Sequence, residues 1–198
     1  MTVTTEQIKK LRDKTNAGFM DCKKALEDTG GDIEKAIAEL RKKGIAVAAK
    51  RAGKSAKEGL IDAYIHLGGK IGVMVEVNSE TDFVARNEMF KQFVKDVAMQ
   101  IAAANPQYIS PEDVPQSVLD GEKDIIASQA KGKPANVIEK MVAGKISKFY
   151  EEVCLLEQPF VKDDKLKVKD YLNDIIAKIG ENISIRRFVR YQLGEDVS

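Results

Sequence analysis

The sequence lacks several residue types and patterns that would identify common classes of protein. It has no tryptophan, a single histidine (His66) and two cysteines (Cys22 and Cys154) among 198 residues. No apolar run approaches the roughly 20 residues that span a bilayer, and the first residues lack the basic and apolar regions of a signal peptide. We therefore expect a cytoplasmic protein without a membrane partner, in which both cysteines are small buried apolar groups.

Catalytic and metal-binding residues are equally scarce. A single histidine leaves one possible imidazole base for a nucleophilic triad, and neither cysteine is close to it in sequence. One histidine and two scattered cysteines offer no recognisable zinc spacing. Gly68-Gly69-Lys70 lacks the first glycine and the final Ser or Thr of a phosphate-binding loop. The sequence therefore predicts no catalytic site, no metal site and no cofactor, and an enzyme is the weakest functional interpretation.

Positive and negative charges are almost balanced, with 32 basic and 31 acidic side chains. A nucleic-acid-binding protein usually concentrates positive charge, so no direct contact with nucleic acid is expected. The local exception is a basic stretch made of Lys50, Arg51, Lys54 and Lys57. This stretch is either a solvated linker or an RNA-binding segment, and RNA binding with a steep salt dependence would support the second interpretation.

Helical periodicity predicts a bundle of three short helices at the start of the chain. Thr4 and Gln7 have the spacing of a capping box, Asp32 can cap the third helix, and Gly44 is expected to end it. The Ala, Gly and Lys residues that follow are expected to form a basic linker. The predicted domains are residues 1–44 (bundle), 45–58 (linker) and 59–198 (core and dimerisation domain).

The core domain is predicted to be α+β. Leu60–His66 and Ile71–Asn78 have the pattern of two strands, joined through Gly68-Gly69, whose positive φ angles suit a tight hairpin turn. Several helices follow, and Ile183–Leu193 is expected to form a last strand, so an antiparallel sheet with several helices is indicated. One face of this sheet is less polar than a solvated face, which favours coverage by another sheet or another subunit. Its predicted residues are Met74, Tyr64, His66 and Phe188.

One stretch, Glu76–Asn87, is the strongest candidate for an interaction site. A β-type run, Ile71–Val77, ends there in polar residues, and Asp82 and Phe83 stand side by side at the turn into a helix. A short turn at the end of a rigid strand can present side chains to a partner. A phenyl ring beside a carboxylate would combine an apolar anchor with a charge. The alternative is that Phe83 closes the local core and Asp82 caps the next turn.

A second candidate lies in the predicted connection between the first two helices. Phe19 and Met20 directly follow Gly18 there. Because a loop is expected at the surface, an aromatic ring and a thioether in it are candidates for partner contact. The alternative is that Met20 packs into the bundle while Phe19 packs against the second helix.

Taken together, these segments resemble bacterial elongation factor Ts, the nucleotide-exchange factor for elongation factor Tu. The resemblance spans nearly the whole chain, and its motifs occur in the right order. Without it, the sequence indicates only an α+β interaction protein. The matching segments are Leu11-Arg12, Thr15–Leu26, Gly31-Asp32-Ile33, Glu76–Ala85, Gln158–Val161 and Lys178–Ile183.

The resemblance implies a function and a set of contact residues. Residues 1–44 are expected to form a ubiquitin-associated-type bundle that contacts the nucleotide-binding domain of elongation factor Tu. The resemblance also implies that the family usually has Met where this chain has Phe19, a change that keeps the loop apolar. The Thr-Asp-Phe-Val motif is expected to intrude near the partner's switch region and to disturb its magnesium and phosphate site. In this sequence the motif is Thr81, Asp82, Phe83 and Val84.

Two further features follow from the resemblance. The segment Ile179, Gly180, Glu181 and Asn182 is expected nearby, and His66 falls where the family has a partner-facing histidine. Longer members have two similar core halves and this chain has one, so a second subunit is expected to replace the missing half in a homodimer. The rival interpretation is an adaptor whose N-terminal bundle binds ubiquitin-like or other partners.

Overall fold

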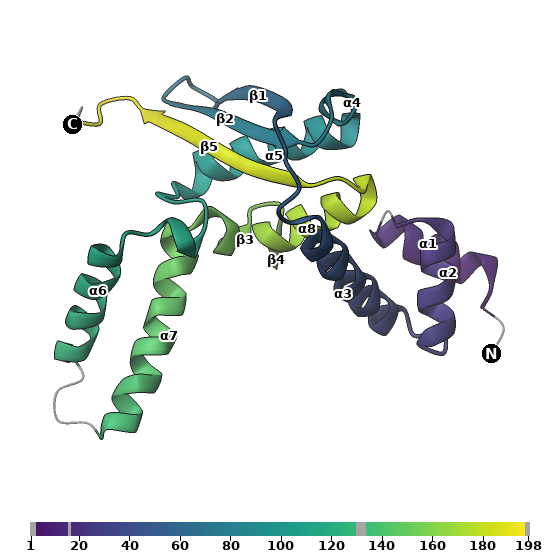
Figure 1. Cartoon of the computed structure of the whole chain (residues 1–198), viewed down its shortest axis with the longest axis horizontal. Helices are drawn as coiled ribbons and strands as arrows, with labels where there is room; N and C mark the ends of the chain where they lie inside the picture. The colour runs from purple at the N-terminus through teal and green to yellow at the C-terminus, as the bar shows by residue number, and fades with distance from the viewer. Residues whose placement is uncertain (1–2, 16, 130–133, 197–198) are drawn as a thin grey trace. The chain divides into compact units, whose positions relative to one another are not determined.

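The structure is a computed structural model that describes residues 3–15, 17–129 and 134–196 (Figure 1). Asn16, which belongs to one of the motifs quoted above, lies outside the described residues. The fold is α+β, as predicted. The chain forms two compact units. The first comprises residues 1–59, 78–91 and 170–184, and the second comprises residues 60–77, 92–169 and 185–198.

The first unit contains the predicted three-helix bundle. It consists of α1 (Thr5–Thr15), α2 (Phe19–Asp28) and α3 (Ile33–Arg51). Apolar side chains from all three helices meet in a small core, which the helical periodicity of the sequence indicated. Its buried residues are Ile8, Leu11, Cys22, Ala25, Leu26 and Ala36.

Both predicted helix caps of the bundle are present. Thr4 N donates to Gln7 Oε1 at 2.9 Å and Gln7 N donates to Thr4 Oγ1 at 3.2 Å, which completes the capping box. Asp32 Oδ1 accepts from Lys35 N at 3.0 Å, and this backbone hydrogen bond lowers the pKa of the Asp32 carboxyl. The caps satisfy backbone donors that the first turn of a helix leaves unpaired.

Helix α3 does not end at Gly44, so the predicted helix end was wrong and residues 45–51 of the predicted linker are helical. Alanines after Gly44 favour helix, and Gly44 and Ala48 are both buried. A Cβ atom on Gly44 would lie 3.6 Å from Ala177 Cβ in α8 (Val168–Ile179). Packing against α8 therefore continues the helix past a residue that locally favours a stop.

Three strands from separate parts of the chain form an antiparallel sheet. It consists of β1 (Glu58–Ile65), β2 (Ile71–Ser79) and β5 (Ile183–Gln192), in the order β1-β2-β5. Gly68 and Gly69 have φ angles of 89° and 68° in the β1–β2 turn, as predicted. These left-handed conformations strain any residue that has a Cβ atom.

Helix α5 (Glu88–Ala104) covers one face of this sheet (Figure 1). Arg190 Nε of β5 donates to the carbonyl oxygen of Ala102 at 3.4 Å, which links the strand to the helix. Strand β2 contributes Val73 and Val75 to the core, and these alternate with the exposed Met74. The fully buried face of α5 is Phe90, Phe93, Val94, Val97 and Ile101.

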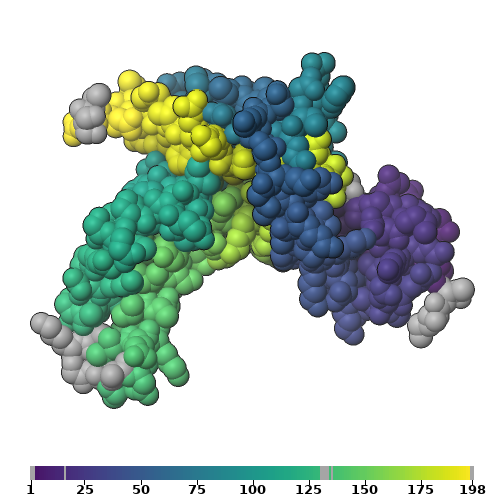
Figure 2. Space-filling model, in the orientation of Figure 1, coloured from purple at the N-terminus to yellow at the C-terminus, as the bar shows by residue number. Residues whose placement is uncertain are grey.

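Helices α6 (Gln116–Gln129) and α7 (Ala135–Val153) pack side by side as a helical hairpin, drawn in green (Figures 1 and 2). At its base Val114, Leu119 and Cys154 form a small buried cluster. Burial, with a smaller contribution from nearby carboxylates, raises the pKa of the Cys154 thiol to about 11 because the thiolate would lose its hydration. No helix within the described residues is long and apolar enough to cross a membrane.

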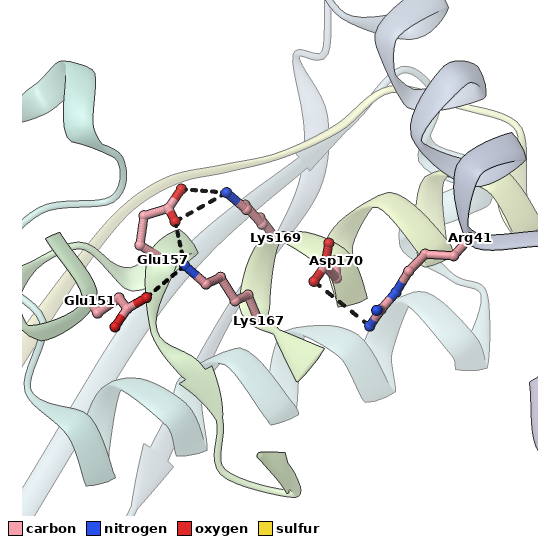
Figure 3. A network of polar contacts seen from close by, with 6 residues as sticks. All are labelled: Arg41, Glu151, Glu157, Lys167, Lys169 and Asp170. Carbon is pink, nitrogen blue, oxygen red and sulfur yellow. Dashed lines mark hydrogen bonds and ion pairs between the residues drawn. The ribbon is translucent and has the colours of Figure 1, made fainter. Parts of the chain in front are cut away.

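An ionic network joins the end of α7 to the start of α8 (Figure 3). Glu157 accepts from Lys169 at 2.8 Å and from Lys167 at 3.0 Å, and Lys167 also donates to Glu151 at 3.0 Å. Burial opposes ionisation of Glu157, but the two lysines outweigh it and lower the pKa of its carboxyl. Lys167 ends β4 (Asp163–Lys167), which pairs with β3 (Pro159–Phe160) and was not predicted.

Candidate partner-binding site

The Thr81–Val84 motif forms the turn between β2 and a very short helix, α4 (Asp82–Ala85). Thr81 is extended, with φ −128° and ψ 157°, and its carbonyl oxygen accepts from Ser79 Oγ at 2.9 Å. Val84 is buried and anchors the turn in its own chain, whereas Phe83 is 78% exposed. The turn therefore presents the phenyl ring to solvent from a fixed position at the end of a strand.

The structure places Phe83 outside the local core, which excludes the alternative in which this ring closes the core. The phenyl ring is among the most exposed large apolar groups of the described residues. Asp82 Oδ2 pairs with Arg86 Nη2 at 2.8 Å, and the start of α4 has no side-chain cap hydrogen bond. Such a site can bury apolar surface in a partner and place a negative charge beside it.

Glu181 binds Thr81 across 100 residues of sequence. Its Oε2 accepts from Thr81 N at 3.0 Å and its Oε1 accepts from Thr81 Oγ1 at 2.7 Å. In return, Glu80 Oε1 accepts from Asn182 N at 2.6 Å. We call this reciprocal pair of carboxylates, Glu80 and Glu181, the acid clasp. It joins the turn after β2 to the turn after α8.

Gly180 positions Glu181, the second carboxylate of the acid clasp. Its φ of 83° lies in the left-handed region, which ends α8 and redirects the chain towards Glu181. Ile179, the last residue of the helix, is half-buried, as are Glu181 and Asn182. The structure thus brings the predicted segment from 179 to 182 beside the Thr81–Val84 motif. That these residues also contact a partner stays a prediction.

Two residues of the predicted linker extend the clasp. Arg51 Nη1 lies 3.5 Å from Glu80 Oε1, and Asn182 Nδ2 donates to the carbonyl oxygen of Lys54 at 2.7 Å. No role was predicted for Glu80, and Arg51 was expected in a solvated or RNA-binding stretch. The only available indication was charge complementarity between a basic stretch and an acidic strand end, which does not identify a pair.

Phe19 and Met20 begin α2 instead of lying in a loop, so that part of the prediction was wrong. Gly18 stands at the N-cap position, and the helix starts immediately after it. Phe19 is 46% exposed and Met20 is 69% exposed, so Met20 does not pack into the bundle. The pair forms an apolar surface on the first turn of α2, and its contact with a partner stays a prediction.

His66 directly follows β1 in the second unit and is exposed. Its Nδ1 lies 3.1 Å from Tyr64 Oη, and its backbone N donates to the carbonyl oxygen of Ile71 at 2.9 Å. The hairpin therefore fixes the backbone of His66, while the ring remains accessible. Its contact with a partner stays a prediction.

The sheet face opposite α5 carries several exposed apolar side chains. Ile65 Cδ1 lies 3.1 Å from where a Cβ atom on Gly72 would stand, which places Ile65 on the same face as Gly72 and Met74. Glu76 Oε2 and Arg187 Nε pair on this face at 2.6 Å. The exposed apolar residues of this face, which we call the open sheet face, are Ile61, Ile65, Met74, Val189 and Tyr191.

The composition of this face differs from the prediction. Tyr64 and Phe188 are half-buried and alternate with Ile65 and Val189, so they lie on the side of α5. His66 contacts Tyr64 and accompanies it. Grouping these three residues with Met74 was wrong because sequence alternation alone does not fix the register between strands.

Comparison with known proteins identifies the family. The family model for "Elongation factor TS" matches residues 2–195. The elongation factor Ts of Carboxydothermus hydrogenoformans is 60% identical over 198 residues, covering 99% of this chain and 91% of the relative. Those of Thermoanaerobacter sp. and Geobacter metallireducens are each 60% identical, covering 98% and 100% of this chain and 97% and 93% of the relative. The chain therefore belongs to the elongation factor Ts family, a family of translation elongation factors.

Proposed function

We propose that this protein is a guanine nucleotide exchange factor that acts in the cytoplasm on elongation factor Tu. It binds the GDP-loaded partner and promotes GDP release by disturbing the partner's magnesium and phosphate site. The observation that carries the proposal is Phe83, which is 78% exposed on a turn held by the acid clasp. The activity makes and breaks no covalent bond, so the protein acts without an enzymatic active site or a cofactor.

The size of the Phe83 ring limits how much free energy this residue can contribute to nucleotide exchange. Burying a phenylalanine side chain in a partner pocket contributes about 1.5–3 kcal/mol, which corresponds to roughly tenfold to hundredfold in an equilibrium constant. Exchange requires that the protein bind the nucleotide-free partner more tightly than the GDP-bound one, and the coupling is reciprocal. Phe83 alone gives only part of that difference, so other contacts must share it.

Asp82 is the second contributor because it stands next to the ring. A carboxylate brought towards bound phosphates opposes their negative charge, and the interaction strengthens where water is excluded. Asp82 is paired with Arg86 in the free protein, at 2.8 Å. An exposed pair of this kind is worth less than about 1 kcal/mol, so Asp82 can leave it at low cost on binding.

Phe19 and Met20 strengthen the binding of this protein to its partner. Their exposed apolar surface on α2 suits a contact with the nucleotide-binding domain of elongation factor Tu. His66 and the segment 179–182, which lies beside the turn, complete the proposed partner-binding set, and Glu181 belongs to it through its hydrogen bonds to Thr81. In this assignment α2 strengthens binding of both loaded and empty partner, whereas Phe83 favours the empty form.

The test is GDP release from elongation factor Tu, followed with fluorescent GDP in the presence and absence of this protein. We expect clear stimulation by the parent and slower release with Phe83→Ala and with Asp82→Ala. Ile125→Ala is the matched control, because Ile125 is also an exposed apolar residue but lies on α6. If both variants matched the parent, the assignment of Phe83 and Asp82 would be wrong.

We further propose that the protein is a homodimer in which the open sheet face is covered by a second copy. The support is the exposed apolar character of this face, where Met74 is 52% exposed and Tyr191 is 67% exposed. A solvated sheet face is normally polar. Size-exclusion chromatography with light scattering should give a dimer at micromolar concentration, and Tyr191→Lys should give a monomer while Ile125→Lys does not. A monomeric parent would contradict the proposal.

A further inference from the structure

We propose that Glu181 and Glu80 are positioning residues, which hold the Thr81–Phe83 turn in the conformation that acts on the partner. The inference rests on the proposed function and adds residues that act through the turn. It follows from the geometry of the acid clasp, in which each carboxylate binds the backbone N–H of the residue next to the other carboxylate.

The turn needs such support because its own helix is too short to fix it. Helix α4 has four residues, and a single helical turn has little stability in water. Thr81 is extended and leaves its N–H and hydroxyl free for partners outside the helix. Glu181 takes both, at 3.0 Å and 2.7 Å. One carboxylate therefore fixes the backbone and the side chain of the residue that begins α4.

The second carboxylate, that of Glu80, fixes the turn after α8. Glu80 lies between the buried Ser79 and Thr81, and its Oε1 accepts from Asn182 N at 2.6 Å. Its side chain is only 19% exposed, so water competes weakly for this hydrogen bond. Hydrogen bonds to charged groups contribute more than neutral ones. Loss of either carboxylate would leave a half-buried amide without its acceptor and loosen both turns.

The clasp also reaches the end of α3. Arg51, the last residue of that helix, lies 3.5 Å from Glu80, and the Lys54 carbonyl accepts from Asn182 Nδ2. The position of the Phe83 turn is thus linked to the helix that completes the N-terminal bundle. A partner that holds the bundle therefore also restrains the base of the turn.

The test combines a measurement on the free protein with one on exchange. In Glu181→Ala, amide hydrogen exchange at Thr81 should be faster by about tenfold or more, while the Gly69 amide of the hairpin turn is unchanged. The maximal rate of stimulated GDP release at saturating protein should fall severalfold. Glu181→Gln keeps one acceptor oxygen, so its amide exchange and its maximal rate should lie between those of the parent and the alanine variant. This second variant keeps the test valid if the alanine variant does not fold.

A double-mutant comparison separates positioning from direct contact. On a Phe83→Ala background, Glu181→Ala should cause little further loss of maximal rate, because the ring that it positions is already absent. Asp174→Ala, which removes a carboxylate of α8 paired with Lys178, is the control and should match the parent in both measurements.

Several results would overturn the proposal. Unchanged amide exchange at Thr81 would show that Glu181 does not hold the turn. A full additional loss on the Phe83→Ala background would show that Glu181 acts directly on the partner, and unaltered GDP release in Glu181→Ala would show that the clasp has no role in exchange. Failure of the proposed function is recognised separately, because the Phe83→Ala variant would then stimulate GDP release from the partner as strongly as the parent does.

Discussion

Arg86 Nη2 lies 2.8 Å from Asp82 Oδ2, one helical turn away, so the carboxylate beside the exposed ring is paired within its own chain. Both side chains are largely solvated, with 77% of Arg86 and 49% of Asp82 exposed. The pair is therefore weak. It partly neutralises the charge that the proposed exchange mechanism uses.

Removal of Arg86 should therefore increase the effect of Asp82 on GDP release. We expect Arg86→Ala to raise the stimulated rate of GDP release by at most about twofold, because the free energy of breaking an exposed i,i+4 pair is about 0.3–0.5 kcal/mol. Asp82→Asn should lower the rate. Lys91→Ala, which breaks the comparable pair with Glu88, is the control and should have no effect. A slower rate with Arg86→Ala would indicate that Arg86 itself contacts the partner.

Two phenylalanines ten positions apart should differ sharply in their effect on stability. Phe93 is fully buried in α5, so Phe93→Ala should lower the free energy of unfolding by about 3–5 kcal/mol. Phe83→Ala should change it by less than about 0.5 kcal/mol, because the ring is exposed. Urea unfolding followed by circular dichroism measures both. A large loss in Phe83→Ala would mean that the ring packs within its own chain.

The exposed pair on α2 should affect association more than the exchange step. Met20→Ala is expected to raise the half-saturating concentration for stimulated GDP release by about three- to tenfold, through the loss of buried apolar surface, while the maximal rate stays near that of the parent. Point substitution is preferable to deletion of residues 1–44, because α3 continues to Arg51 and the deletion would cut it. A lower maximal rate with unchanged half-saturation would contradict the assignment.

The buried thiol of Cys154 should make stability depend on alkaline pH. Burial raises its pKa to about 11 in the folded protein, above the ordinary value of 9.0. The folded state therefore holds this proton more tightly than the unfolded state. The contribution of the protonated thiol to the free energy of unfolding is fully present below about pH 9. It is lost as the pH rises to about 11, by up to about 3 kcal/mol.

Comparison with Cys154→Ala isolates this contribution from other groups that titrate at high pH. The difference in unfolding free energy between parent and variant, measured in urea at pH 8, 9 and 10, should shrink as the pH rises. The native thiol should also react slowly with a thiol reagent at pH 8 compared with the unfolded chain. A difference that is constant with pH would show that the thiol ionises equally in both states.

Local sequence patterns were sufficient for features whose causes lie within a few residues. The Thr4–Gln7 box, the Asp32 cap and the Gly68-Gly69 turn all depend on neighbours in sequence, and each was predicted correctly. The exposed position of Phe83 was one of two alternatives, and the sequence could not choose between them. The choice depends on burial, which a one-dimensional pattern reports only on average.

Features that depend on distant segments were missed. The acid clasp joins residues about 100 positions apart, and neither glutamate has a sequence neighbour that identifies its partner. Helix α3 passes Gly44 because α8 packs there. Strand β4 has the sequence Asp-Asp-Lys-Leu-Lys, which lacks apolar alternation, and pairing with β3 alone establishes it.

The continuity of α3 has a consequence for the spacing of the first unit. Ala36 lies in the core of the bundle and Gly44 lies against α8, so one helix sets a separation of about 12 Å between the two packing sites, at 1.5 Å per residue. An inserted residue between them would rotate one site relative to the other by about 100°. The number of residues between Ala36 and Gly44 is therefore fixed by the two packing sites.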